Sequence, residues 1–228
     1  MDFILIICLA LFLLTILWGK SRKCNRIVDA HGKLMISNDL HLFHLSGVFI
    51  LGIIPLLNYE RFPFGINPAH INIQKWLIVI LATGLAGWIS YVAAGKVKFS
   101  AEKSLNLAKL RKYIGYYLFL RIIYILAYET FFRGWLFEDS IDRFGLWPAV
   151  GLNVLLYAGF HIPNGRNEAI ATIPFGLVMC LLVWWSGSVI PAICLHLVLS
   201  LVFDYKILRK LTEWLHIQSV HGRPEFKR

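Results

Sequence analysis

Long apolar blocks alternate along the chain with short polar connections. A helix needs about 20 mostly apolar residues to cross a bilayer. Seven blocks approach or reach that length, at residues 3–18, 42–58, 76–95, 114–137, 145–161, 168–186 and 188–205. A tight turn at Ser186-Gly187-Ser188 is expected to separate the last two blocks. The pattern predicts an all-α fold, a polytopic transmembrane bundle of about seven helices.

Two charged segments carry apolar residues at helical spacing. Residues 101–112 and 207–217 both predict basic amphipathic helices lying on the membrane surface. A solvated helix face explains the first segment equally well. The chain is therefore expected to have one or two interfacial helices. The sequence divides into a membrane-spanning region (1–112), a helix bundle that carries the candidate chemistry (113–205) and a basic tail (206–228).

Composition and charge fit a membrane protein. The chain is 58% hydrophobic and only 16% charged, whereas soluble domains carry about 25% charged residues. The net charge of +10 comes from basic residues between the apolar blocks, while the aromatic residues lie within the blocks. This separation excludes nucleic acid as the expected partner and favours membrane lipids. Basic residues follow the first, third and last blocks, so the positive-inside rule predicts an outside N-terminus and a cytoplasmic C-terminus.

The fourth block holds charged residues that need a reason to lie within a membrane. These are Arg121, Glu129 and Arg133. Glu129 and Arg133 are four residues apart, so they share a helix face and can pair. A structural ion pair would by itself explain both of them.

Two later blocks each carry a polar stripe with i, i+4, i+8 spacing. The stripes are Asn153, Tyr157 and His161, and His196, Ser200 and Asp204. Each stripe must face protein or a water-filled cavity rather than lipid. Each residue also has a structural explanation, such as an interfacial position for Asp204. Together with Glu129, however, the two imidazoles can bind a divalent metal such as zinc or polarise a water.

These residues resemble motifs of the CPBP (CAAX protease and bacteriocin-processing, or Abi) family of intramembrane endopeptidases. The family's Glu-Glu-x-x-x-Arg motif is similar to Tyr128–Arg133, its Phe-x-x-x-His motif to Tyr157–His161, and its His-x-x-x-Asn motif to His196–Ser200. The resemblance covers about residues 121–204. The order and spacing of the three motifs, on the fourth, fifth and seventh blocks, make the combination specific.

The resemblance implies an endopeptidase that cleaves a membrane-associated peptide or protein with activated water, in a bacterial plasma membrane. Glu129, His161 and His196 would activate the water and are the expected ligands if a metal such as zinc is bound. Ser200 would stabilise the oxyanion, and Arg133 would orient Glu129.

Two departures from the family pattern leave alternatives open. Tyr128 replaces the first glutamate, and Ser200 replaces the asparagine. Because tyrosine is not a carboxylate base, a degenerate member that acts as a membrane binding or bacteriocin-immunity protein is the second hypothesis. A small transporter or ion pathway is the third. It has less support, because the sequence shows no matching halves.

Overall fold

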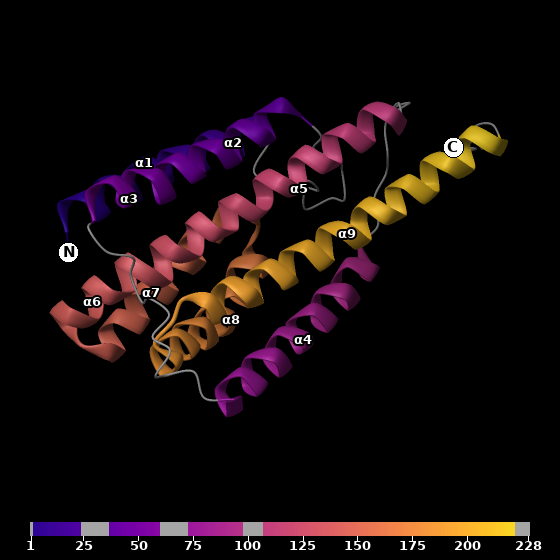
Figure 1. Ribbon diagram of the computed structural model, residues 1–228. Coiled ribbons are helices and arrows are strands. Elements are labelled where there is room, and N and C mark those ends of the chain that lie inside the picture. Colours follow the sequence, from indigo (N-terminus) through magenta and orange to yellow (C-terminus); the bar gives the residue numbers. More distant parts are fainter. Residues whose placement is uncertain (1, 24–36, 60–72, 98–106, 222–228) are drawn as a thin grey trace.

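The computed structural model describes residues 2–23, 37–59, 73–97 and 107–221, and every regular element in these ranges is helical (Figure 1). The elements are α1 (Phe3–Arg22), α2 (Asn38–Val48), η1 (Phe49–Ile53), α3 (Ile54–Asn58), α4 (Ile73–Lys96), α5 (Leu107–Glu129), η3 (Thr130–Trp135), α6 (Leu136–Phe144), α7 (Leu146–His161), η4 (Ile162–Asn164), α8 (Arg166–Ser186) and α9 (Ile190–His221). Seven of the helical stretches are long and apolar enough to span a membrane, which confirms the predicted fold class.

The break between the last two spans lies where the sequence predicts it. Helix α8 ends at Ser186, and Gly187 takes a left-handed conformation with φ 70°. Glycine adopts this conformation without the steric cost of a Cβ atom. The Ser186 hydroxyl accepts from the Ser188 amide, and the Ser188 hydroxyl accepts from the Ile190 amide. The turn therefore satisfies backbone amides that have no partner within either helix.

Two spans contain a π-helical segment that the sequence pattern does not predict. Segment η1 joins α2 to α3, and η3 follows Glu129 directly. The Asn153 side chain of α7 donates to the Phe132 carbonyl of η3 at 2.5 Å. Asn153, the first residue of the polar stripe on α7, thus supports the wider helical turn next to Glu129.

Helix α5 runs through the middle of the bundle, with α1 and α2 along one side and α9 along the other (Figure 1). Phe12 of α1 contacts aromatic rings from several spans. Its ring centre lies 5.9 Å from that of Tyr128, 6.3 Å from that of Phe132 and 5.3 Å from that of Phe160. This aromatic cluster joins α1 to the region that carries the three motifs.

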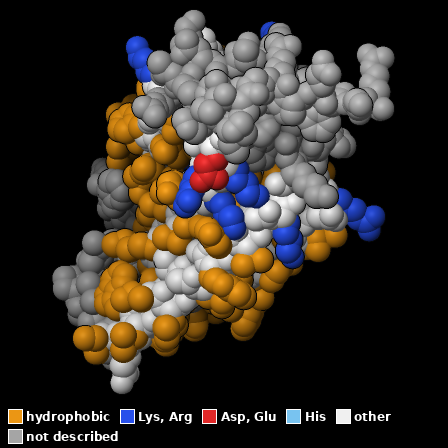
Figure 2. All heavy atoms as spheres, turned by 90° about the vertical axis from the view of Figure 1, so that its right-hand side faces the viewer, with side chains coloured by type: hydrophobic (Ala, Val, Ile, Leu, Met, Phe, Trp, Pro, Cys, Tyr) orange, Lys and Arg blue, Asp and Glu red, His pale blue; other side chains and the backbone are white. Residues whose placement is uncertain are grey.

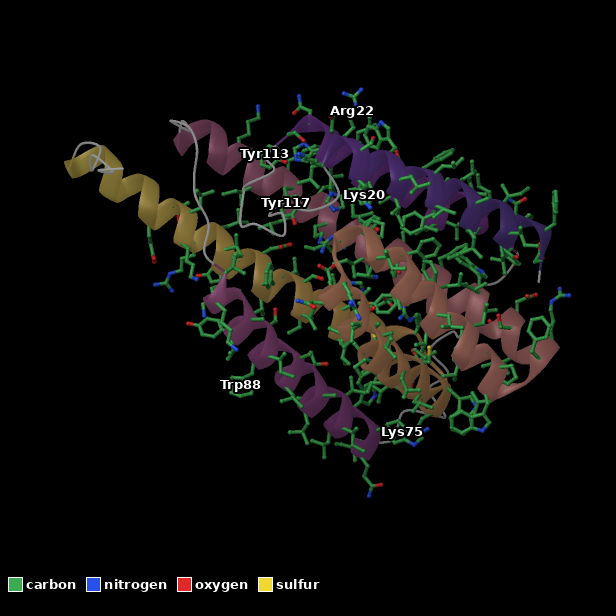
Figure 3. All side chains as sticks on the ribbon, turned by 180° about the vertical axis from the view of Figure 1, so that it is seen from behind. Lys20, Arg22, Lys75, Trp88, Tyr113 and Tyr117 are labelled. Atoms are coloured by element: carbon green, nitrogen blue, oxygen red, sulfur yellow. The ribbon has the colours of Figure 1, made fainter. Side chains whose placement is uncertain are left out.

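Helix α4 packs mainly on α9, at the outside of the bundle (Figure 1). A Cβ atom added to Gly87 would lie 2.9 Å from Val198 Cγ1, so the two helices approach closely there. Ser90 Oγ donates to the Leu199 carbonyl at 2.5 Å. On the other face of α4, Trp88 points away from the protein (Figure 3) and is largely exposed, as expected for a lipid-facing position.

Lysines of α9 also hold the C-terminal end of α4. Lys206 Nζ donates to the Tyr91 carbonyl at 2.8 Å, and Lys210 Nζ donates to the Ala94 and Gly95 carbonyls at 3.1 and 2.8 Å. Cations are favourable near a helix C-terminus, where carbonyls lack helical partners. Lysine and arginine side chains gather on this face of the molecule, and hydrophobic side chains cover much of the rest of it (Figure 2).

The second predicted amphipathic helix is helical but is not separate. Helix α9 runs without a break to His221, and Ile207, Leu208 and Leu211 are buried within the protein. No glycine or proline follows Asp204 within the helix, so nothing ends it at the predicted boundary. The first half of the earlier segment, 101–106, lies outside the described residues, and residues 107–112 form the start of α5. The proposed three-part division remains a prediction, and α5 and α9 each run across one of its boundaries.

Candidate functional site

A cavity of about 1040 Å³ lies among the spans and is lined by residues of both polar stripes. His161, His196 and Ser200 line it, together with Tyr157 and Tyr128. The structure thus brings three of the predicted site residues to one cavity, from α7 and α9. The prediction that the His196 stripe faces protein or a cavity is confirmed, because Ser200 and Asp204 are buried and line the same space.

Glu129 lies behind His196 rather than on the cavity wall. Its side chain has no exposed surface, and its Oε1 atom accepts a hydrogen bond from His196 Nδ1. Its Oε2 atom lies 3.3 Å from Nη1 of Arg133, which is equally buried. The predicted i, i+4 pair is therefore present. The carboxylate is shared between a guanidinium and an imidazole.

Each of the two cavity-lining histidines has its Nδ1 atom engaged by another group of the protein. His161 Nδ1 lies 2.7 Å from the Tyr157 carbonyl, and a carbonyl can only accept, so Nδ1 carries the proton. His196 Nδ1 faces Glu129. In both rings Nε2 is then the atom left for a molecule in the cavity.

Arg133 is held in place by its neighbours. Its guanidinium lies 4.2 Å from the centre of the Tyr157 ring, a cation–π contact between η3 and α7. Gly176 of α8 allows this packing. A Cβ atom there would lie 3.0 Å from Tyr157 Cδ1 and 3.6 Å from Arg133 Nη2. The sequence analysis did not single out Gly176, because its signal is spatial rather than a motif.

Tyr128 occupies the cavity wall at the position of the family's first glutamate. Its ring centre lies 5.8 Å from that of His196, in an edge-on arrangement. Among the described residues, its buried hydroxyl has no hydrogen-bond partner. The side of the helix that faces the cavity therefore carries a phenol, and the remaining glutamate faces inward.

A second polar cluster, which the sequence analysis did not assemble, lies further along the same helices. Tyr117 OH donates to Asp204 Oδ2 at 2.8 Å, and Arg121 Nε lies 3.6 Å from the same oxygen. Arg121 Nη1 lies 3.5 Å from His44 Nε2. Asp204 is thus buried beside Tyr117 and Arg121, and its expected interfacial position remains a prediction. His44 of α2 is a buried neighbour of Arg121.

The residues proposed as metal ligands do not form a ready metal site. In the part of the chain that the structure describes, no three His, Cys, Asp or Glu side chains gather as a metal site requires. Glu129 already contacts Arg133 and His196, and it lies on the far side of His196 from the cavity. A structural or catalytic zinc needs at least three protein ligands around one point. The donor set therefore does not fit a zinc ion.

These features describe an integral membrane protein whose spans enclose a histidine-lined cavity. Residues 111–202 match the family model described as type II CAAX prenyl endopeptidase Rce1-like, and this confirms the resemblance to the CPBP family. The matched stretch contains all three motifs, from Tyr128 to Ser200. At the level of the family, the similarity is to intramembrane endopeptidases of the CAAX-protease type. No curated protein and no solved structure matches the chain.

Proposed function

We propose that the protein is an intramembrane endopeptidase that cleaves a membrane-associated peptide or protein, with His196 as the general base. The supporting observation is that His196 lies between a buried carboxylate and a cavity. Glu129 engages its Nδ1 atom, so its Nε2 atom is the base available to water. Of the three residues expected to activate the water, this assignment makes His196 the one that takes the proton and gives Glu129 an indirect role.

The water would be held by both imidazoles. One O–H bond donates to His196 Nε2 and the other to His161 Nε2, which leaves an oxygen lone pair for the scissile carbonyl carbon. As the C–O bond forms, His196 takes a proton from the water. Glu129 then faces an imidazolium and stabilises its charge, as a carboxylate does in Ser-His-Asp enzymes.

The remaining groups act on the tetrahedral intermediate. Ser200 lies one helical turn beyond His196 on the same cavity wall, where its hydroxyl can donate to the developing oxyanion. His196 then returns its proton to the amide nitrogen, the C–N bond breaks, and a carboxylic acid and an amine leave. Arg133 is a positioning residue, because it contacts Glu129 and has no exposed surface.

The test is cleavage of quenched fluorescent peptides, inserted in liposomes, by purified protein. We expect His196→Gln and His161→Gln each to reduce kcat/KM by at least about a hundredfold, the usual size of a general-base effect. The matched control is His41→Gln. The His41 ring packs 4.4 Å from the Tyr113 ring and is not a lining residue of the cavity. Cleavage that survives both cavity variants would refute the mechanism.

A degenerate, ligand-binding family member is the second candidate, and the position of Tyr128 favours it. In this case the wild-type protein would cut nothing, because the cavity wall carries a phenol where the family has an acid. The variant Tyr128→Glu distinguishes the two proposals. Cleavage that appears only in Tyr128→Glu identifies a scaffold that has lost its acid. Cleavage by wild type that depends on His196 identifies the enzyme.

A further inference from the structure

Arg121 is a charged group on the cavity wall whose hydrogen-bonding capacity is only partly used. Its side chain is 21% exposed, and it lines the cavity. Among the described residues, its Nε atom has no hydrogen-bond partner. The oxygen of Asp204 lies 3.6 Å from it, and the Nη1 contact with His44 is 3.5 Å long. A guanidinium has five N–H donors, so Arg121 retains donors for a further acceptor.

Asp204 orients Arg121 but does not use all of its N–H donors. The oxygen nearest Arg121 already accepts from Tyr117 OH at 2.8 Å. Lys96 of α4 lines the same cavity and adds a second positive charge. The other lining carboxylate, Glu168 of α8, accepts from Asn164 at 2.6 Å at the start of that helix.

The cluster lies at a defined distance from the histidine pair. Arg121 precedes Glu129 by eight residues on α5, and Asp204 follows His196 by eight residues on α9. At 1.5 Å per residue both helices separate the two places by about 12 Å. Apolar residues of α4, among them Leu85, line the cavity as well. The cavity therefore combines apolar walls, a part lined by Arg121 and Asp204, and a part lined by His161 and His196.

We propose that Arg121, together with Lys96, forms an anion-binding subsite that takes the carboxylate at the end of an apolar chain. Arginine suits this ligand, because its planar fork matches both oxygens of a carboxylate. The apolar part of the ligand lies along the α4 wall. The subsite requires no hydrolysis, so it is independent of the function proposed above. A fatty acid and the free C-terminus of an apolar peptide share this chemistry.

The test is photolabelling of the purified protein, in non-ionic detergent, with a diazirine derivative of palmitic acid. We expect labelled peptides to map to the cavity wall, and Arg121→Gln to weaken the apparent affinity by roughly tenfold or more, as for loss of a charged hydrogen bond. Arg143→Gln is the matched control. Arg143 also pairs with an aspartate, Asp139 at 2.9 Å, but it is not a lining residue of the cavity.

Competition identifies the group that is bound and its source. Hexadecanol should compete poorly against the probe, since it lacks the carboxylate. An apolar peptide acid that competes when its C-terminal amide does not would identify a peptide end as a source. Competition by unlabelled palmitate alone would identify a fatty acid. Equal competition by palmitate and hexadecanol would overturn the proposal, and so would equal labelling of Arg121→Gln and wild type.

A second pair of variants keeps the test decisive if Arg121→Gln does not fold. Lys96→Gln should also weaken labelling, and its control is Lys75→Gln at the other end of the same helix. Lys75 donates to the Trp185 carbonyl at 2.9 Å and does not line the cavity. Equal labelling of the two lysine variants would refute a basic subsite.

Discussion

The buried ion pair between Glu129 and Arg133 predicts a large and specific loss of stability. Neither side chain has exposed surface, and the closest charged atoms are 3.3 Å apart. The substitution Arg133→Met keeps an unbranched apolar stem of similar length but removes the charge. It leaves the Glu129 carboxylate buried with His196 as its remaining polar contact.

The size of the effect follows from this geometry. Two unit charges 3.3 Å apart attract by about 5 kcal/mol at an effective dielectric constant of about 20. Breaking a buried pair by removing one partner typically costs 3–5 kcal/mol, so we expect roughly that loss in the free energy of unfolding. Loss of the Tyr157 contact adds about 0.5–2 kcal/mol. The double variant Glu129→Gln/Arg133→Met should regain most of the charge-related loss, because it buries no unpaired charge.

The measurement is reversible unfolding in mixed detergent–SDS micelles, arranged as a double-mutant cycle. The Arg133–Tyr157 contact is lost whether or not Glu129 is present, so its contribution to the free energy of unfolding cancels in the cycle. Arg143→Met supplies the control, because Arg143 and Asp139 form an i, i+4 pair of the same kind on an exposed surface. That variant should lose far less stability. The reasoning fails if Arg133→Met is no more destabilised than Arg143→Met.

Two further predictions concern packing and topology. Gly176→Ala should lower the thermal unfolding temperature and reduce any His196-dependent activity, because its Cβ would press on Tyr157. Gly151→Ala should do neither, because its Cβ would have no neighbour within 4 Å; equal effects on the two would refute the packing argument. Under the predicted orientation, Arg143→Cys in a cysteine-free background should react with an impermeant maleimide in intact cells. Arg166→Cys should react only after permeabilisation, and the opposite result would invert the topology.

Hydropathy predicted the spans well because lipid forces each one to be long, apolar and helical. The end of α8 was equally predictable from Ser186-Gly187-Ser188. The π-helical segment after Glu129 was not, since its wider turn depends on a contact from Asn153, 21 residues away from Phe132. The extension of α9 past residue 205 was also missed. Ile207, Leu208 and Leu211 pack on protein, and a sequence pattern does not distinguish this packing from contact with a membrane surface.

The candidate site was predictable as a set of residues but not as an arrangement. Residue types and spacing picked out Glu129, Arg133 and His196. They could not show that His196 stands between the carboxylate and the cavity, because that order depends on how α5 and α9 face each other. Nor could they join His44 to Arg121, which lies 77 positions later in the chain.

The packing of α4 on α9 has a consequence for how the protein is made. Helix α4 ends at Lys96 and α9 begins at Ile190. The ribosome adds the intervening stretch of nearly 100 residues in about 5–20 s. During that time α4 lies in the membrane without its main partner. Glu129, once it has been added, lacks the His196 imidazole until α9 is made. The cavity and the histidine pair are completed only when the last span is added, so an unfinished chain lacks the candidate site.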